Sequence, residues 1–332
     1  MLKHSILLLI PLFSSKMLSQ KTDSLSANTK DNTYITYYEE AIKIRLNLSN
    51  TFNSFYIKQS ETNLAFHLTP NQRIRSTLTA IYKFIEVDIG YTPEFIRFNK
   101  DDRIKGESKF FNMGATFYFG SWRQQLQYSK TKGFYVDKKE LSTTENILFP
   151  DFQVIKIGGT TSYILNKNFS FRSIYIQSEW QIKSTGSFVP GISYYYTRIR
   201  NSHPSEDRII DVAAGPAYYY NWIIDKSFLI SGGAYAGLGY NQTKTVYNDA
   251  SPTEMVDGLS LQTQIRGTLA YNSTRFYTGI TASLNSVYYK TDPMIQVRDN
   301  QQFYEFFIGY RFNAPDKLRK ITDKSLKYIK KK

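Results

Sequence analysis

The sequence predicts an all-β protein, an antiparallel up-and-down β-barrel that crosses a membrane. Apolar and polar residues alternate along much of the chain, as in the stretch LSLQTQIRGTLAYN, Leu259–Asn272. Side chains on a strand point alternately to opposite faces, so this stretch has one apolar and one polar face. Connections of unequal length and an aromatic content of 16% indicate the same fold. Membrane barrels combine short turns at one rim, long loops at the other and aromatic girdles.

Residues 1–19 have the features of a secretory signal peptide. A cationic start at Lys3 precedes an apolar run from Ile6 to Phe13, and the small Ser19 permits cleavage before Gln20. The run is too short to span a bilayer as a helix, and a buried first helix is the alternative. Residues 20–36 are mostly polar, which predicts a flexible, exposed leader.

Charge and cysteine content restrict the classes of partner. The chain contains no cysteine, which excludes disulfides and thiolate metal sites. Removal of residues 1–19 takes away two lysines and no acid, so the formal charge falls from +14 to +12. An exported chain does not meet nucleic acid, so no nucleic-acid partner is expected. The tail, residues 314–332, carries eight basic and two acidic residues, a net charge of +6.

The basic tail has two interpretations. As an amphipathic helix it would contact the inner leaflet of the membrane or a periplasmic partner. As a solvated segment it would do neither.

The predicted barrel extends over residues 37–313. We estimate about twelve strands, an even number as in other barrels of this class. Fourteen is the alternative, since the strand directions counted from the two ends disagree between 168 and 209. A soluble β-sandwich also explains the alternation. The candidate strands lie at about 42–49, 64–69, 73–82, 84–91, 109–119, 121–131, 153–165, 168–183, 187–199, 209–222, 226–245, 258–272, 274–290 and 299–312.

Polar side chains on three of these strands are expected to face the lumen, because the apolar face meets lipid. Charged residues of both signs occur among them, so they would line a permeation path or lock together as a plug. The expected lumen-lining residues are Gln177, Glu179, Gln181, Lys183, Gln262, Gln264, Arg266, Glu305 and Arg311.

No catalytic residue, metal site or cofactor is predicted. A lipid hydrolase would need a histidine beside a serine, and the exported chain has only His67, on the polar face of its strand, and His203, in the loop RNSHPSED. The acidic pairs Asp101–Asp102 and Glu206–Asp207 lack the spaced ligands of a calcium loop.

Five short motifs resemble those of the domain of unknown function (DUF) 4421 family. They are IQSEWQIKSTGSF from Ile176, LTPN from Leu68, KGFYV from Lys132, FPDF from Phe149 and GYRFNAP from Gly309. The chain departs from the pattern at His67 and Leu68, where an aromatic and basic lead into Pro-Asn is expected. The resemblance covers most of the exported chain. It implies an outer-membrane barrel of Gram-negative bacteria without an assigned activity.

The sequence therefore predicts an outer-membrane barrel of unassigned role, for which a narrow solute channel is one interpretation. A lipid hydrolase using His67 or His203 and a closed structural or adhesive barrel are the alternatives. The expected partners are outer-membrane lipid and the barrel-insertion machinery.

Overall fold

Strands make up most of the computed structural model, which describes residues 33–38, 41–82, 85–93, 95–96, 99–175, 179–200, 205–247, 252–292 and 294–316. Its short helices are α1 (Asp102–Lys105) and α2 (Arg172–Tyr175), and no helix of the described residues is long and apolar enough to cross a membrane. The strands are β1 Ile35–Tyr37, β2 Ala41–Gln59, β3 Ala65–Leu68, β4 Arg75–Tyr82, β5 Ile85–Tyr91, β6 Lys109–Phe119, β7 Trp122–Val136, β8 Ile147–Tyr163, β9 Glu179–Gln181, β10 Thr185–Phe188, β11 Gly191–Arg200, β12 Ser205–Gly215, β13 Ala217–Ile224, β14 Phe228–Tyr247, β15 Glu254–Asn272, β16 Phe276–Asp292 and β17 Ile295–Asn313.

Fifteen of these strands form one antiparallel sheet that occupies twelve positions, in the order β5-β4-β2-β17-β16-β15-β14-β12-β11-β8-β7-β6. Three positions hold two strands in succession. β3 and β4 both pair with β2, and β12 and β13 both pair with β14. In the third position, β10 pairs with β13 and β11 pairs with β12. Pro216 separates β12 from β13, as expected of a residue that cannot donate a ladder hydrogen bond. The predicted antiparallel fold with twelve strands is confirmed.

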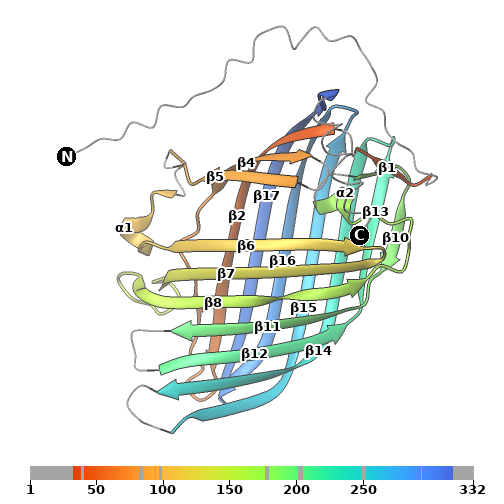
Figure 1. The fold of residues 1–332 in the computed structure, drawn as a ribbon. Helices are drawn as coiled ribbons and strands as arrows, with labels where there is room; N and C mark the ends of the chain where they lie inside the picture. Colours follow the sequence, from red (N-terminus) through yellow and green to blue (C-terminus); the bar gives the residue numbers. More distant parts are fainter. Residues whose placement is uncertain are drawn as a thin grey trace.

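The sheet curves round so that β6, β7, β8, β11 and β12 lie in front of β2 and β15–β17 (Figure 1). Its two edges, β5 and β6, are not paired with each other in the described part of the chain. Among the described residues, the other strands of the twelve-position path pair on both sides, whereas the short strands β3 and β10 each pair with one neighbour, β2 and β13.

The polarity of the wall is that of a membrane barrel, with apolar side chains outside and polar side chains inside. On β15, Ile265 is 63% exposed, whereas Thr268 is 2% exposed. On β17, Ile308 lies outside and its neighbour Phe307 inside, in an apolar layer of the lumen. The outward side chains of β15–β17 form an apolar surface, which water would not stabilise and lipid would.

The prediction of a wall strand at 168–183 is wrong. Residues 164–175 and 179–184, here called the in-turned segment, contain α2 and β9, and β9 pairs with β1 in a separate two-stranded sheet. Glu179, Trp180 and Gln181 are all buried, although a wall strand would expose every second residue. The fourteen candidate strands therefore reduce to twelve positions, because 168–183 is not a wall strand and β3 and β4 share one position.

The lumen contains two apolar layers. The turn-end layer lies near the short turns and includes Phe171 and Trp180 of the in-turned segment, packed with Tyr219, Leu229 and Tyr277 of the wall. The loop-end layer lies near the long loops and joins residues of several wall strands. It consists of Phe55, Leu68, Phe134, Val136, Val154, Ile209, Val287, Tyr289 and Val297.

The end of the predicted leader also belongs to the interior. Ile35 is 3% exposed and lies opposite Gln181, and Thr36 lies opposite Trp180. The predicted signal peptide lies outside the described residues, as does the tail beyond Asp316.

Candidate functional site

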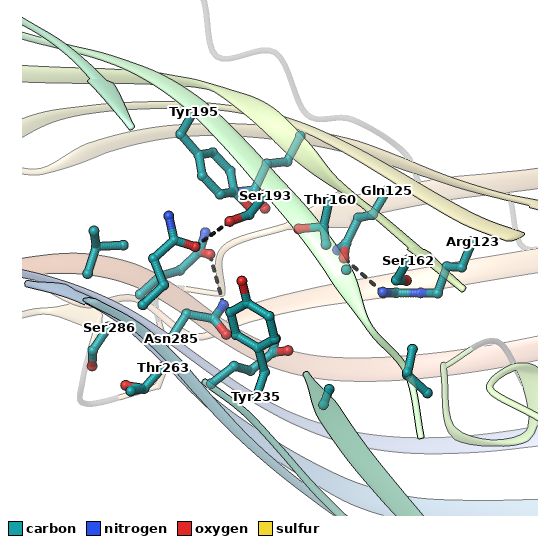
Figure 2. Close-up of a pocket in the computed structure, with 18 of the residues that line it drawn as sticks. Arg123, Gln125, Thr160, Ser162, Ser193, Tyr195, Tyr235, Thr263, Asn285 and Ser286 are labelled. Atoms are coloured by element: carbon teal, nitrogen blue, oxygen red, sulfur yellow. Dashed lines mark hydrogen bonds between the residues drawn. The ribbon is translucent and has the colours of Figure 1, made fainter. Parts of the chain in front are cut away.

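A polar chamber lies in the lumen between the two apolar layers. Inward side chains of the wall and Phe171 of the in-turned segment line a partly open cavity with about 90 Å³ of space for water-sized molecules. Figure 2 shows hydroxyl and amide groups pointing into it from several strands. The lining residues include Arg123, Gln125, Lys156, Ser193, Tyr195, Tyr219, Tyr235, Gln262, Gln264, Asn285, Asp299 and Gln301.

An ion pair crosses the chamber. The Nζ atom of Lys156 on β8 lies 2.8 Å from Oδ2 of Asp299 on β17, and the two side chains are 7% and 5% exposed. Five strands separate β8 from β17 in the sheet, so the contact joins opposite walls. The Lys156 ammonium also lies 5.0 Å from the centre of the Tyr195 ring. A buried pair of this kind holds its partners strongly, because each charge alone would be poorly solvated.

A second polar link also joins separated strands. Gln262 on β15 donates from Nε2 to Asp211 on β12, and its Oε1 accepts a hydrogen bond from Ser193 on β11. Asn241 donates to the other carboxylate oxygen of Asp211 at 3.2 Å. Gln262 therefore connects strands that are not neighbours.

The rest of the chamber is rich in amide and hydroxyl groups. Tyr219 donates to Oε1 of Gln264 at 2.9 Å, and Asn285 donates to Gln301 at 3.2 Å. These groups offer hydrogen bonds to a polar molecule, and the tyrosine rings offer apolar faces.

Arg123 joins the wall to the in-turned segment. Its Nη2 donates to Gln125 at 2.8 Å, and its guanidinium lies 5.2 Å from the centre of the Phe171 ring. Figure 2 shows Arg123 beside Gln125 and Ser162 at the border of the chamber.

Further hydrogen bonds fix the in-turned segment below the chamber. Trp180 donates from Nε1 to the Lys226 carbonyl at 2.7 Å. Gln181 donates to the Asn168 and Tyr34 carbonyls at 2.8 and 3.1 Å. Asn221 of the wall lies 3.5 Å from the hydroxyl of Ser173 in α2.

The predicted lumen-lining residues occupy different places. Gln262 and Gln264 line the chamber, and Arg266 is buried beside Phe303. Arg311 is buried at the turn end, where its guanidinium lies 3.8 Å from the Tyr38 ring centre and 4.5 Å from that of Tyr277.

Other members of the predicted set lie away from the chamber. Glu179 is in β9, where it binds Ser170 and Arg172, and Gln181 is in the same strand. Lys183 is exposed and lies near the Tyr34 ring. Glu305 is on β17 and half-buried, and Gln177 is outside the described residues.

The charged residues that line the chamber, Lys156, Asp299 and Arg123, were not predicted from the sequence, nor was Asp211, which binds the lining residue Gln262. The signal for Lys156 was present, since it is a cation between Ile155 and Ile157 in an alternating strand. Its pairing with Asp299 depends on the strand order, which alternation does not give.

His67 is on the polar face of its strand, which could have faced the lumen, but in the structure this face is the outer one. His67 lies opposite Tyr56, whereas the adjacent pair Leu68 and Phe55 points into the loop-end layer. In this part of the wall the apolar residues are the inward ones, so the polar face is outside. Nδ1 of His67 lies 3.2 Å from Oε2 of Glu140, and the ring contacts Tyr56. His203 is outside the described residues.

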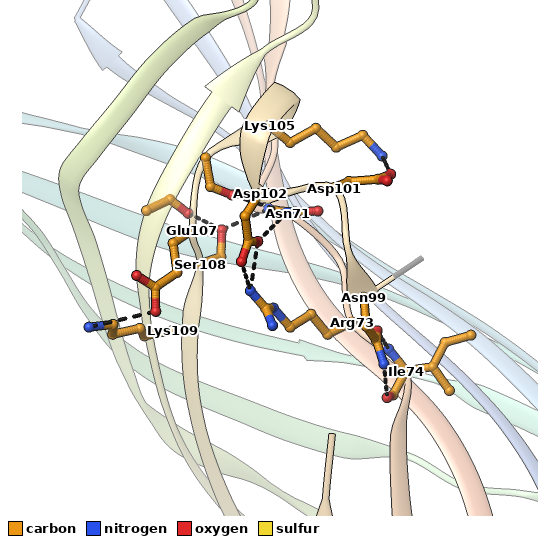
Figure 3. Close-up of polar contacts among 12 residues, drawn as sticks. Asn71, Arg73, Ile74, Asn99, Asp101, Asp102, Lys105, Glu107, Ser108 and Lys109 are labelled. Atoms are coloured by element: carbon orange, nitrogen blue, oxygen red, sulfur yellow. Dashed lines mark hydrogen bonds and ion pairs between the residues drawn. The ribbon is translucent and has the colours of Figure 1, made fainter. Parts of the chain in front are cut away.

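The acidic pair Asp101–Asp102 is taken up in contacts that fix the loop between β5 and β6, as Figure 3 shows. Asp101 binds Lys105 at 2.9 Å, and both carboxylate oxygens of Asp102 accept from Arg73. Asn71 of the LTPN motif also donates to Asp102, at 2.9 Å. Within the described ranges, no three histidine or acidic side chains are grouped so as to hold a metal ion.

These features define the class of protein, an antiparallel β-barrel with an apolar outer surface and a polar, partly filled lumen. The family described as Domain of unknown function (DUF4421) matches residues 29–312, and the chain belongs to this family. No curated protein matches the sequence significantly.

Solved outer-membrane barrels resemble the chain in structure. The outer membrane protease OmpT from Escherichia coli is 6% identical, with a TM-score of 0.41, and the match covers 83% of this chain and 98% of that one. The Pseudomonas putida toluene transporter TodX is 7% identical, with a TM-score of 0.24 and coverage of 83% and 90%. These likenesses say nothing about activity.

Proposed function

We propose that the chain is an outer-membrane barrel that passes small polar solutes through a gated lumen. The observation that carries the proposal is the Lys156–Asp299 pair, which crosses a polar chamber between two apolar layers. A barrel that needed only a filled interior could use apolar residues throughout. Here the lumen keeps a hydrophilic space. The Lys156–Asp299 ion pair spans this space, and an ion pair can open and close.

The chemistry of the chamber favours uncharged, hydroxyl-rich solutes. Asp299 and Asp211 are bound by Lys156 and by the amides of Gln262 and Asn241. The amide groups of Gln264 and Asn285 and the rings of Tyr195 and Tyr235 are the kind of lining that binds hydroxyl groups and the apolar faces between them.

The gate has two parts in this proposal. The ion pair and the loop-end layer close the chamber toward the loops, and the in-turned segment closes it toward the turns. Passage requires both to move. The segment is held mainly by side-chain contacts rather than by the ladder of the large sheet, so its displacement leaves the wall intact.

Planar-bilayer recording tests the proposal. Lys156→Gln/Asp299→Asn keeps a polar lining and removes both charges, so it should raise the open probability above that of the wild type. The exposed pair Lys132–Asp151, at 2.9 Å, supplies the matched control Lys132→Gln/Asp151→Asn, which should behave as wild type. Absence of conductance from wild type and gate variant alike, with both shown to be folded by heat-dependent gel migration, would establish a closed structural barrel and refute passage.

A further inference from the structure

A row of cations crosses the outer face of the wall near the loop end. Lys130 on β7 and Arg198 on β11 both lie opposite Ile155 on β8, Arg198 lies opposite Arg208 on β12, and Arg208 lies opposite Lys244 on β14. Residues in register on neighbouring strands share a face of the sheet.

The face that carries this row is the outer one. The chain neighbours Ser129, Thr131, Thr197, Ile209 and Thr243 are buried at 1–7% exposure, and they point into the lumen. The cations alternate with them and so point outward. Arg208 is 47% exposed on its side chain and Arg198 30%.

Three like charges directly opposite one another on successive strands destabilise a sheet unless an anion offsets them. Glu206 offsets part of this charge. Its Oε1 accepts from Nε of Arg208 at 2.8 Å, its Oε2 accepts from Nε of Arg200, and Nε of Arg198 lies 3.5 Å away. Three guanidinium groups thus share one carboxylate, and Lys244 adds a fourth positive charge.

This arrangement orients the arginines for a second anion. Within the part of the chain that the structure describes, Glu206 contacts each guanidinium on its Nε side, so the terminal amino groups can bind another oxyanion. A planar guanidinium binds phosphate through two parallel hydrogen bonds, which makes arginine the preferred phosphate ligand. Among the described residues, two other acids point outward nearby, Asp151, which binds Lys132, and Asp257, which lies opposite Gln242 in the next row.

The position of the row identifies the source of the phosphate. The next outward row toward the turns contains Tyr128, Ile157, Tyr196 and Ile210, in register on the same strands. Aromatic and apolar side chains at this level mark the edge of the hydrocarbon. The cations lie just beyond that edge, on the side of the long loops, where lipid headgroups lie.

We infer that Arg198, Arg200, Arg208 and Lys244 bind the phosphate groups of a lipid headgroup in the outer leaflet. The inference rests on the proposed membrane location and is independent of solute passage. Adjacent strands are about 4.8 Å apart, so the row from β11 to β14 is wide enough for one phosphorylated headgroup. Bound lipid would offset the repulsion among the arginines, and it would stabilise this part of the wall.

Native mass spectrometry of the detergent-solubilised protein tests this binding. The probes are lipid A with two phosphates, the same lipid A after dephosphorylation, and inorganic phosphate. The wild type should retain diphosphorylated lipid A and discriminate against the dephosphorylated form. Arg198→Gln/Arg208→Gln/Lys244→Gln should weaken retention at least about tenfold, because charge-assisted hydrogen bonds are lost.

The matched control is Lys109→Gln/Lys138→Gln/Lys139→Gln, which removes the same charge from exposed positions outside the row. It should retain lipid as the wild type does. Equal retention by the row variant, or equal binding of dephosphorylated lipid A, would overturn the inference. Full displacement of the lipid by inorganic phosphate would assign the row to free anions instead of lipid. Heat-dependent migration of every variant separates these outcomes from misfolding or from failure of the membrane assignment.

Discussion

Lys156 and Asp299 meet across the lumen, with 2.8 Å between Nζ and Oδ2, although five strands separate them along the sheet. The contact joins opposite walls at the level of the chamber. Its burial means that each charge depends on the other for solvation. The pair is therefore both a structural tie and the element whose opening the proposed passage requires.

Removal of one partner should destabilise the barrel more than removal of both. Lys156→Met leaves the Asp299 carboxylate buried without its cation, which costs about 3–5 kcal/mol in comparable pairs. Lys156→Met/Asp299→Leu should recover most of this loss. Urea unfolding in phospholipid vesicles gives the free energies. Lys132→Met, at the exposed pair with Asp151, should cost no more than about 1 kcal/mol, and a similar cost at Lys156 would contradict the tie.

The in-turned segment can be locked to the wall because the chain has no cysteine to interfere. Ser173 and Asn221 are in side-chain contact, so Ser173→Cys/Asn221→Cys should form a disulfide on oxidation. If the segment must move for passage, the oxidised protein should lose conductance and the reduced protein regain it.

A disulfide between wall strands is the control for this lock. The hydroxyl oxygens of Thr268 and Thr281 lie 3.0 Å apart on β15 and β16. Thr268→Cys/Thr281→Cys should conduct equally in both redox states. Conductance through the oxidised Ser173→Cys/Asn221→Cys protein would show that the segment is not part of the gate.

Alternation predicted the wall well where one face meets lipid and the other meets polar lumen. Leu261, Ile265 and Leu269 are exposed, and Gln262 and Thr268 are buried, because two different solvents select residues at every second position. The pattern alone gave fourteen candidate strands, and the structure reduces them to twelve positions because 168–183 is not a wall strand and β3 and β4 share one position.

The pattern failed where the surroundings of the strand changed. Near the loops the lumen is apolar, so Leu68 points inward and His67 outward, which reverses the expected faces. In the in-turned segment Glu179 and Trp180 alternate, yet both are buried. Alternation reports two unlike faces and does not say which one is outside. The chamber and the cationic row both depend on strand order, a long-range property of the fold.

A lysine on the outer face should be tolerated near the rim and not at mid-membrane. Ile265 and Leu259 on β15 are both exposed, at 63% and 86%. Ile265→Lys should cost about 2–4 kcal/mol and Leu259→Lys at most about 1 kcal/mol, because the penalty for a charge depends on its depth in the bilayer. Unfolding in vesicles measures both. A soluble sandwich would tolerate the two lysines equally, so equal costs would count against the membrane wall.

The open edges of the sheet should pair in the membrane. β5 and β6 each have one unpaired side within the described residues, and hydrocarbon does not tolerate unpaired backbone groups. Ile89 on β5 and Phe111 and Met113 on β6 point to the same outer face and are exposed. We expect Ile89→Cys to form an intramolecular disulfide in membranes with Phe111→Cys or with Met113→Cys, depending on the register of the seam.

Non-reducing gels of boiled samples reveal the cross-link as a faster band that the reducing agent removes. Ile89→Cys/Leu259→Cys is the control, because β15 lies on a different part of the wall and should give no such band. Cross-links found only as dimers would mean that β5 and β6 pair between molecules, and the barrel would then close through a second copy.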